Sequence, residues 1–335
     1  METDYTELER KIDAVSVITL GSINTDIVGR VPKITSKGGV SFGGEVRIGA
    51  GGKARNMAQM MSALLGPGRV AMVGKSSKDP YGLWKPPIEA LDESGVNTDF
   101  IKLLDFEETR KYPGISLISV DDEGRNQIYV FPGVNEEFRE RDVDDARILF
   151  ESVGKNNGML VLSLDIPLST ATYCLKKSTE YGLKSFLDPG GIVNEADYDN
   201  LLDEEIFLIK PNEHESKLLT GVDVEDFDSA KEASKYLLGK NVKNVLITAG
   251  RDGAYFFNEM HQAHIPIPKI EGGRYKDETG CGDQAMATLC SYLVDGYDIM
   301  YAARCAVVSG TLKFYRPGTT PVSRDEITKA ILAYP

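Results

Sequence analysis

Histidine, tryptophan and cysteine are scarce in this chain of 335 residues, which contains three His, one Trp and four Cys. The cysteines include no CxxC pair, and a chain of this length can build a core without covalent cross-links, so a disulfide scaffold is excluded. Positive charge is also in short supply: 38 Lys and Arg face 51 Asp and Glu, for a formal net charge of −13. A field of that sign repels phosphate backbones and anionic lipids, which argues against nucleic-acid and membrane partners.

Long apolar runs are missing as well. No apolar stretch approaches the ~20 residues needed to cross a bilayer, and the polar first twelve residues contain no apolar core of a signal peptide. With 41% hydrophobic and 27% charged residues, the composition is that of an ordinary folded protein. We therefore expect a folded protein of a reducing compartment, the cytoplasm.

The sequence does contain a regular alternation of short β-branched runs with helical patterns. Strands are expected at residues 15–20, 70–73, 159–163, 184–187, 207–209 and 244–248, and helices at 53–65 and 84–94. This alternation predicts an α/β fold whose right-handed crossovers build a mostly parallel sheet with helices on both faces. No repeat or linker interrupts the pattern, so residues 1–335 are expected to form one domain.

Two segments do not follow the alternation. Residues 26–48 are rich in Gly and Val without a helical period, and residues 109–132 alternate apolar and polar side chains around a turn at 121–124. The pattern predicts a small antiparallel sheet at the edge of the main sheet. Such a sheet is either an ordinary decoration or a lid over a cleft.

The strongest chemical motif is DETGCGD at 277–283, which is followed by an apolar helical pattern. Unpaired N–H groups and the helix dipole make a helix start an anion site, and Gly280 and Gly282 allow a phosphoryl group to approach closely. Asp283 stands beside this site, where a carboxylate takes a proton from an attacking hydroxyl. The alternative is a Gly-rich turn with an N-capping Asp. Cys281 has no His near it in the sequence, so we expect it to offer its amide and not a nucleophilic thiol.

A second Gly-rich helix start is GAGGKARN at 49–56. Close backbone approach at Gly52, together with Lys53 and Asn56 on the first turn, suits a polyhydroxylated ligand; the alternative is a loop-to-helix junction with solvated cations. Arg55 adds a charge that a neutral sugar does not need but that a phosphate would use. We therefore include Arg55 among the expected substrate-binding residues.

Asn24 and Asp26 follow the first predicted strand. Ligands of open α/β sheets bind at the carboxyl ends of the strands, so both side chains are expected at the cleft. Asx turns are the alternative explanation for these two residue types.

Two later strands also end in polar turns. In KPNEHE at 210–215, Asn212 and Glu215 could position a hydrated Mg²⁺ ion, which prefers a few oxygen ligands. A Pro turn followed by an acidic helix start is the alternative. Gly250 and Gly253 follow the strand at 244–248 in a turn suited to the phosphates of a nucleotide.

Together and in this order, the motifs resemble those of the ribokinase family of carbohydrate kinases, the PfkB group, over essentially the whole chain. The matching segments are GAGGKARNMAQMMSALLG (49–66), VGKSSKDPYG (73–82), IKPNEHES (209–216), LITAGRDGAYFF (246–257) and DETGCGDQAMATLCSYLVDG (277–296). The resemblance implies a ribokinase-like αβα sandwich with a mostly parallel, Rossmann-like central sheet. It also implies a small β-sheet lid, formed by residues near 26–48 and 109–132.

Carried over position by position, the resemblance implies an ATP:sugar phosphotransferase in which Asp283 is the base and residues 280–282, including Cys281, form an anion hole. The other implied residues are Asn24, Asp26, Gly52, Lys53, Asn56 and Asp165 for the substrate, Lys210, Asn212, Thr248, Gly250 and Gly253 for the nucleotide, Glu215 for Mg²⁺ through water, and Asp277 and Thr279 for a monovalent cation. Mg²⁺ and ATP are the implied cofactor and co-substrate; ADP as donor and K⁺ as activator are left open.

Two places depart from the family pattern. Ala54 and Arg55 follow the Gly-Lys pair, where the family usually has Gly, and Gln284-Ala285-Met286 follows Asp283, where a small residue and Phe are common. The far end of the cation loop corresponds to RPGTTP at 316–321.

The acceptor is left open. A free sugar is favoured because Gly51-Gly52-Lys53 followed by Asn56 matches the ribose-binding pattern. The main alternative, based on Arg55, is a phosphosugar such as ribose 1-phosphate or fructose 1-phosphate, and nucleosides and myo-inositol are further alternatives. A non-catalytic binding protein is disfavoured because it would not need Asp283. The apolar lid segment also predicts pairing with a second copy, as a homodimer.

Overall fold

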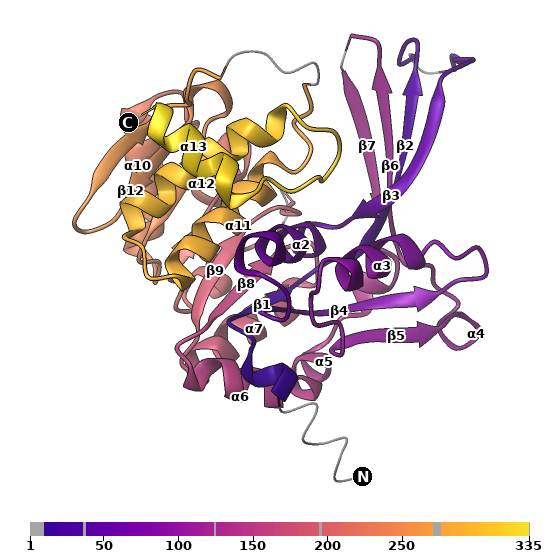
Figure 1. Cartoon of the computed structure of the whole chain (residues 1–335), viewed down its shortest axis with the longest axis horizontal. Helices are drawn as coiled ribbons and strands as arrows, with labels where there is room; N and C mark the ends of the chain where they lie inside the picture. Colours follow the sequence, from indigo (N-terminus) through magenta and orange to yellow (C-terminus); the bar gives the residue numbers. More distant parts are fainter. Residues whose placement is uncertain (1–9, 36–37, 124, 194–195, 271–275, 335) are drawn as a thin grey trace.

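The computed structural model describes residues 10–35, 38–123, 125–193, 196–270 and 276–334. Its main element is a nine-stranded sheet in the order β13-β12-β11-β10-β9-β8-β1-β4-β5 (Figure 1). The strands are β1 (Val17–Leu20), β4 (Val70–Lys78), β5 (Ile101–Asp105), β8 (Met159–Ser163), β9 (Lys184–Asp188), β10 (Leu208–Ile209), β11 (Val245–Thr248), β12 (Ala254–Phe257) and β13 (Gln262–Ile265). All pairings between β5 and β11 are parallel, while β12 and β13 form an antiparallel edge, so the predicted fold class is confirmed.

Strand side chains alternate between two hydrophobic cores, one on each face of the sheet. Ile18 and Leu160 belong to one core, and Val17 and Val161 to the other, because successive residues of a strand point to opposite faces. Helices close both cores, which is why the strands are nearly continuous apolar runs.

The first core is covered by α5 (Glu140–Asp145), α6 (Arg147–Lys155), α7 (Leu168–Glu180), α8 (Asp199–Leu202), α9 (Glu213–Thr220) and α10 (Phe227–Gly239). The second core is covered by α2 (Lys53–Leu65), α3 (Lys85–Glu93), α11 (Cys281–Val294), α12 (Ile299–Phe314) and α13 (Arg324–Ala333). Short 3₁₀ turns lie at Gly133–Glu137 and Gly250–Asp252. Within the described parts of the chain, no helix has both the length and the apolar character needed to span a membrane.

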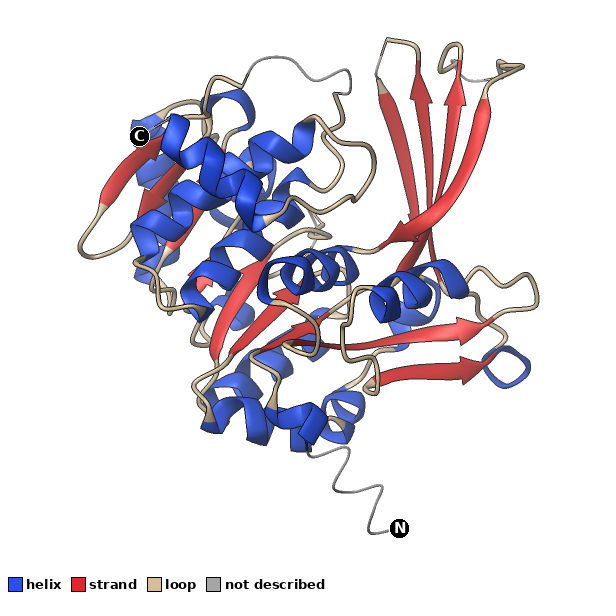
Figure 2. Ribbon diagram, in the orientation of Figure 1, coloured by secondary structure: helices blue, strands red, loops and turns tan. Residues whose placement is uncertain are grey.

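A second sheet of four strands, in the order β3-β2-β6-β7, stands away from the main one (Figure 2). Its strands are β2 (Asn24–Val31), β3 (Glu45–Gly51), β6 (Gly114–Asp121) and β7 (Asn126–Phe131), so they fall in or beside the two segments predicted to form it. Residues 36–37 and 124 of these segments, and 1–9 and 335 of the predicted domain, lie outside the described residues.

The prediction of an antiparallel sheet is right for β2–β3 and β6–β7 but wrong for the central pair, because β2 and β6 run parallel. β2 follows β1, and β6 follows β5 and the short helix α4 (Phe106–Thr109). β1 and β5 both pair in parallel with β4. β2 and β6 therefore leave the same edge of the main sheet in the same direction.

Candidate active site

Polar residues from several strands meet at one edge of the main sheet. β1, β8, β9, β10 and β11 run parallel, so their carboxyl ends point the same way. The polar residues at or after these ends are Asn24 and Asp26, Asp165, Asp188, Lys210 and Thr248. This is the edge at which ligands bind in open α/β sheets.

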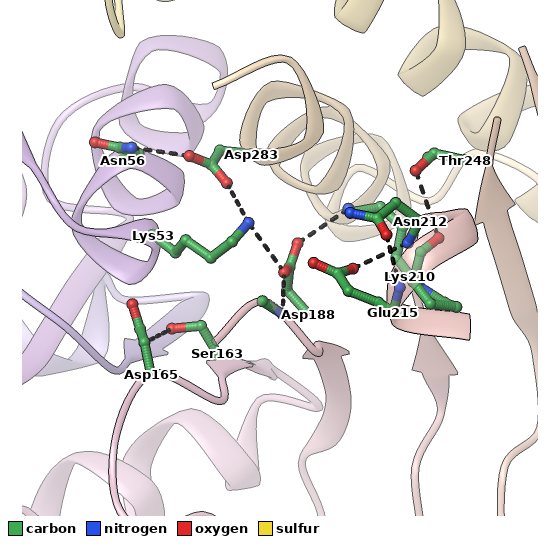
Figure 3. A network of polar contacts seen from close by, with 12 residues as sticks. Lys53, Asn56, Ser163, Asp165, Asp188, Lys210, Asn212, Glu215, Thr248 and Asp283 are labelled. Atoms are coloured by element: carbon green, nitrogen blue, oxygen red, sulfur yellow. Dashed lines mark hydrogen bonds and ion pairs between the residues drawn. The ribbon is translucent and has the colours of Figure 1, made fainter. Parts of the chain in front are cut away.

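Asp283 lies in the first turn of α11, which starts from Gly280 in the left-handed conformation (φ 75°) that Gly adopts without strain. The Asp283 side chain is buried, and both of its carboxylate oxygens are bound by residues of α2. Oδ1 lies 3.1 Å from Lys53 Nζ, and Oδ2 accepts a hydrogen bond of 2.8 Å from Asn56 Nδ2 (Figure 3). Lys53 and Asn56 lie three residues apart on one helix, which puts both side chains on the same face.

Asp188 is a site residue that the sequence analysis missed. Its carboxylate lies between two lysines, with Oδ1 3.2 Å from Lys53 Nζ and Oδ2 3.0 Å from Lys210 Nζ, and it has no exposed surface. A Cβ on Gly190 would overlap the Lys53 side chain, so this approach needs Gly at position 190. The sequence feature that could have identified Asp188 is a polar residue at the end of a buried strand, the same feature that identified Asn24.

The lysines set the charge state of this cluster. Burial by itself raises the pKa of Asp188, but the positive charges of Lys210 and Lys53 outweigh it and hold that pKa far below its ordinary value. Burial also lowers the pKa of Lys53, yet Asp188 and Asp283 together raise it well above the usual range. Lys53 therefore stays an ammonium ion at neutral pH.

Asn24 and Asp26 lie at the base of the second sheet. Asn24 is buried and accepts a hydrogen bond of 2.9 Å from Asn135 Nδ2, a second residue that the sequence analysis missed. Gly52 is required beside this turn, because a Cβ on it would lie 2.6 Å from the Ser22 carbonyl oxygen. Burial raises the pKa of Asp26, and hydrogen bonding by Ser116 and the charge of Arg55 oppose the rise.

Asp165 is half-buried and is bound by serines from two strand ends. It accepts hydrogen bonds from Ser163 Oγ at 2.6 Å and from the backbone N–H of Ser22 at 3.2 Å. Ser22 Oγ in turn donates to Asp165 and accepts from the backbone N–H of Lys53 at 3.2 Å. The structure thus connects Asp165 to the start of α2, and its direct contact with a sugar stays a prediction.

Arg55 has no exposed surface, and its donors bind the protein's own oxygens. The guanidinium donates to the carbonyls of Gly51 (3.2 Å) and Ala50 (3.0 Å), to Gln59 (2.6 Å), to Thr319 (3.1 Å) and to Asn56 Oδ1. Burial lowers its pKa to about 10, against the charges of Asp26 and Asp283. Arg55 therefore holds Asn56, which itself binds Asp283, from behind the site.

The expected nucleotide-binding residues lie on the other side of Asp188 (Figure 3). Asn212 and Glu215 form a capping box at the start of α9, with bonds of 2.8 and 2.9 Å between each side chain and the other's backbone N–H. Thr248 lies beside this turn and donates its backbone N–H to Pro211 O at 2.9 Å. The capping alternative is therefore present in the structure, and it leaves one oxygen of Glu215 unused in the box.

The surroundings of the glycines in this region differ from one position to the next. Gly250 and Gly253 both have positive φ, 47° and 90°. A Cβ on Gly253 would overlap the carbonyl oxygen of Ile265, so strand packing alone explains it, whereas Gly250 faces open space. Gly282 lies beside Lys210, whose Nζ is 3.4 Å from the position of a Cβ on that glycine. An anion at the start of α11 would therefore also meet the Lys210 ammonium.

Asp277 joins the two halves of the expected cation loop. Its Oδ1 accepts from the backbone N–H of Thr279 at 2.9 Å, and its Oδ2 accepts from that of Gly318 at 2.8 Å. Cys281 lies next to this junction, and burial raises the pKa of its thiol to about 12. A thiol with that pKa is protonated at neutral pH and is a poor nucleophile, and the role of the Cys281 amide stays a prediction.

The donor set suits magnesium carried by a nucleotide better than a resident metal. Among the residues described, no group of three or more His, Cys, Asp or Glu side chains is arranged to hold an ion. Burial and the nearby charge of Asp188 raise the pKa of Glu215, so these two carboxylates lie close enough to repel each other. Carboxylate oxygens near each other fit a Mg²⁺ ion that keeps most of its waters.

A carboxylate held at the glycine-lined start of a helix, with lysines beside it, is an arrangement that suits a phosphotransferase acting on a hydroxyl. Comparison with known proteins gives the family. The chain belongs to the pfkB family carbohydrate kinases, whose model matches residues 15–326. It is therefore a phosphotransferase with an alcohol group as acceptor, as the motifs predicted.

Individual proteins of known sequence or structure resemble the chain over most of its length. The deoxyribokinase of Salmonella typhi is 25% identical over 305 residues, which cover 91% of this chain and 94% of that protein. The ribokinase of Haemophilus influenzae is 31% identical over 244 residues, 72% of this chain and 74% of that protein. The structure of Arabidopsis thaliana ribokinase complexed with ribose and ATP matches with a TM-score of 0.80 at 26% identity, covering 94% of this chain and 98% of that one. Giardia lamblia ribokinase matches in fold, with a TM-score of 0.83 at 22% identity over 96% of this chain and 100% of that one.

Proposed function

We propose that the protein transfers the γ-phosphoryl group of ATP to a hydroxyl of a free pentose, ribose or 2-deoxyribose, with Asp283 as the general base. The observation that carries this proposal is the position of Asp283, buried at the start of α11 with Lys53 and Asn56 on its two carboxylate oxygens. The named relatives, a deoxyribokinase and ribokinases, support the pentose.

The charge balance of the site supports a neutral acceptor over a phosphorylated one. Lys53 and Lys210 are paired with Asp188 and Asp283, and the Arg55 guanidinium is buried among protein oxygens. Asp26 adds a further carboxylate on the sugar side. Substrate hydroxyl groups can donate hydrogen bonds to these carboxylates. A substrate phosphate would instead be repelled by negative charge that the cations of the site do not compensate. The alternative of a phosphosugar based on Arg55 thus depends on a side chain that lies behind the site.

In the proposed reaction, the acceptor hydroxyl donates to Asp283. A carboxylate has about four lone-pair sites, and Lys53 and Asn56 use two of them, so it can accept the hydroxyl as well. The proton passes to Asp283 as the oxygen–phosphorus bond forms and the bond to the leaving ADP breaks. The amides of residues 280–282 and the Lys210 ammonium stabilise charge on the transferred group.

When bound, Mg²⁺ would neutralise part of the negative charge on the phosphates of ATP. We propose that Glu215 holds it through water and that Asn212 and Thr248, with Gly250 and Gly253, border the nucleotide. Their roles stay predictions.

We also propose that the chain acts as one catalytic domain, in which the four-stranded sheet closes over the sugar. Asn24 and Asp26 lie on β2 of that sheet, so its movement would carry hydroxyl-binding groups toward the acceptor. Closure excludes water and so suppresses hydrolysis of ATP.

A second proposal is a homodimer formed through this sheet. Ile128, Tyr129, Val130 and Phe131 on the edge strand β7 are each more than half exposed, as are Val46 and Ile48 on the opposite edge. An apolar unpaired edge of this kind suits pairing with a second copy. The cytoplasmic location stays a prediction.

An acceptor panel tests the proposed function. Ribose, 2-deoxyribose, fructose, myo-inositol, nucleosides, ribose 1-phosphate and fructose 1-phosphate would each be supplied with Mg-ATP and, separately, with Mg-ADP, and product would be detected by ³¹P NMR. We expect turnover on a free pentose with ATP. Turnover on phosphorylated sugars alone would replace the proposal with the phosphosugar alternative and would require Arg55 to move.

A further inference from the structure

Lys313 is a buried cation that the proposed reaction does not use. It lies in the last turn of α12, and its side chain has no exposed surface. Its ammonium donates to the carbonyl oxygen of Arg316 at 3.2 Å. Among the described residues, no carboxylate forms an ion pair with it. An ammonium ion buried without a counter-ion is costly unless the charge serves some interaction.

The ammonium lies where two loops meet behind the catalytic helix. Asp277 bonds to Phe314 O through its backbone N–H at 2.9 Å and to the backbone N–H of Gly318 through Oδ2 at 2.8 Å. Lys313 Cε is 3.7 Å from the position of a Cβ on Gly280, the residue that starts α11. Lys313 therefore lies inside the junction that fixes the start of this helix.

The same junction is the one that the family resemblance assigns to a monovalent cation. Its oxygens, however, already have donors: Asp277 accepts from the backbone N–H groups of Thr279 and Gly318, and the Arg316 carbonyl accepts from Lys313. Burial lowers the pKa of Lys313, while Cys281, Asp277 and Asp283 raise it, so the carboxylates of Asp277 and Asp283 act on this ammonium. A K⁺ ion bound to these oxygens would also lie close to the buried Lys313 ammonium, 3.2 Å from the Arg316 carbonyl oxygen, and the two positive charges would repel each other. The residues present therefore do not fit a free K⁺ ion.

We propose that the Lys313 ammonium takes the place of a monovalent cation in this chain, so that phosphoryl transfer needs no added K⁺. Lys313 is a positioning residue: it holds the loop at 314–318 against Asp277 and thereby fixes the amides at the start of α11. The proposal rests on the proposed function for its kinetic consequence, but its effect on the folded protein is independent of any acceptor.

The first test is a cation titration of the wild-type protein. Activity with the best acceptor and Mg-ATP is measured from zero to 100 mM KCl, with choline chloride holding the ionic strength constant. We expect less than a twofold change. Activation of tenfold or more by K⁺, but not by choline, would overturn the proposal.

The second test creates a cation requirement. Lys313→Met keeps the length of the side chain and removes its charge, so kcat should fall by roughly 10- to 100-fold through misplacement of the anion hole. Added K⁺ should restore part of that loss, and tetramethylammonium should not. Lys329→Met, on the exposed face of α13, is the matched control and should leave kcat unchanged with or without K⁺. Full activity of Lys313→Met without any cation would show that the ammonium is dispensable.

A third measurement needs no turnover and separates failure of this inference from failure of the proposed function. Binding to the folded state raises the melting temperature, so K⁺ should raise the Tm of Lys313→Met relative to choline and leave that of the wild type unchanged. A K⁺-dependent rise in the wild type alone would overturn the inference even if no acceptor is found. If Lys313→Met does not fold, the wild-type titrations decide the matter by themselves.

Discussion

Lys53 connects the two halves of the site at the scale of single residues. Its ammonium contacts Asp283, from the first turn of α11, and Asp188, from the end of β9. Asp188 in turn contacts Lys210, beside the residues proposed to bind the nucleotide. Along this row the charges alternate, negative at Asp283 and Asp188 and positive at Lys53 and Lys210. Removal of any one of these side chains therefore leaves a neighbouring charge without an ion-pair partner.

Asp188→Asn removes the negative charge from this cluster with little change in shape. Breaking a buried ion pair typically costs about 3–5 kcal/mol, because the partner charge is left uncompensated. We therefore expect the variant to unfold at clearly lower urea concentration at pH 7. Asp203→Asn is the control, since Asp203 pairs with Lys240 at the surface, where such pairs contribute little. Equal urea midpoints for the two variants would contradict this interpretation.

The same carboxylate predicts a pH dependence. Because the folded-state pKa of Asp188 lies far below its unfolded value of about 3.9, its stabilising contribution is complete above that value and is lost as the pH falls below it. The stability difference between wild type and Asp188→Asn should therefore be largest near pH 6 and should narrow at pH 3. A difference that is constant over this range in urea unfolding would count against the ion pairs.

Cys281→Ala should preserve catalysis. The thiol is protonated at neutral pH and donates a hydrogen bond to the Asp277 carbonyl oxygen at 3.6 Å, while the backbone amide of residue 281 is unchanged by the substitution. We expect kcat within about threefold of wild type, the size of a small packing change rather than of a lost nucleophile, and slow alkylation of the wild-type thiol by iodoacetamide at pH 8. A loss of more than 100-fold would make Cys281 a chemical participant.

At the scale of elements, strand register decides which side chains reach the proposed sugar site. β2 and β3 pair so that Asn24 is opposite Gly51 and Asp26 is opposite Gly49. A Cβ on Gly51 would overlap the Asp26 carboxylate, which is the flexible end of a side chain and can rotate away. Asp26 thus depends on a glycine in the neighbouring strand for its orientation.

Gly51→Ala should therefore affect substrate binding more than folding. We expect KM for the sugar to rise by about tenfold or more, the range for loss of one hydrogen bond to a substrate hydroxyl, with little change in Tm. Gly29→Ala, in the same sheet, is the control, because its Cβ would lie 4.0 Å from the nearest atom, Ile118 O. An unchanged KM in steady-state assays of Gly51→Ala would remove Asp26 from the substrate site.

The elements themselves could largely be predicted from the sequence, because each depends on local pattern. The helix at 53–65 and the strand at 159–163 have the predicted bounds, and DETGCGD does start a helix. The contact of Asp188 with Lys53 could not be predicted, since the two residues lie far apart in the chain. The burial of Lys313 could not be predicted either, since it depends on how the layers pack. Arg55 shows the same limit: its charge was visible in the sequence, but its burial behind Asn56 was not.

At the scale of the whole molecule, the second sheet carries the surface proposed for dimer formation. It projects from the sheet edge that carries the site, and its β7 strand is exposed along its length (Figure 1). A dimer through this sheet would bury its apolar side chains and hold the proposed lid of each copy beside its site.

Sedimentation equilibrium at micromolar concentration should give twice the mass of the chain. Ile128→Asp, on β7, places a charge in the proposed interface and should shift the protein to monomer, because an unpaired charge is costly to bury. Leu332→Asp, on the exposed surface of α13, is the matched control and should remain dimeric. A monomeric wild type would dispose of the dimer without affecting the catalytic proposal.

The central claim is that Asp283 takes the proton of a sugar hydroxyl, and one comparison tests it most directly. Phosphoryl transfer from Mg-ATP to ribose and to 2-deoxyribose would be measured for the wild type and for Asp283→Asn, with Tm and far-UV circular dichroism confirming that both are folded. The account predicts turnover by the wild type and a kcat lower by about 10²-fold or more in the variant, the scale of a lost general base. Near-normal turnover by folded Asp283→Asn would contradict it.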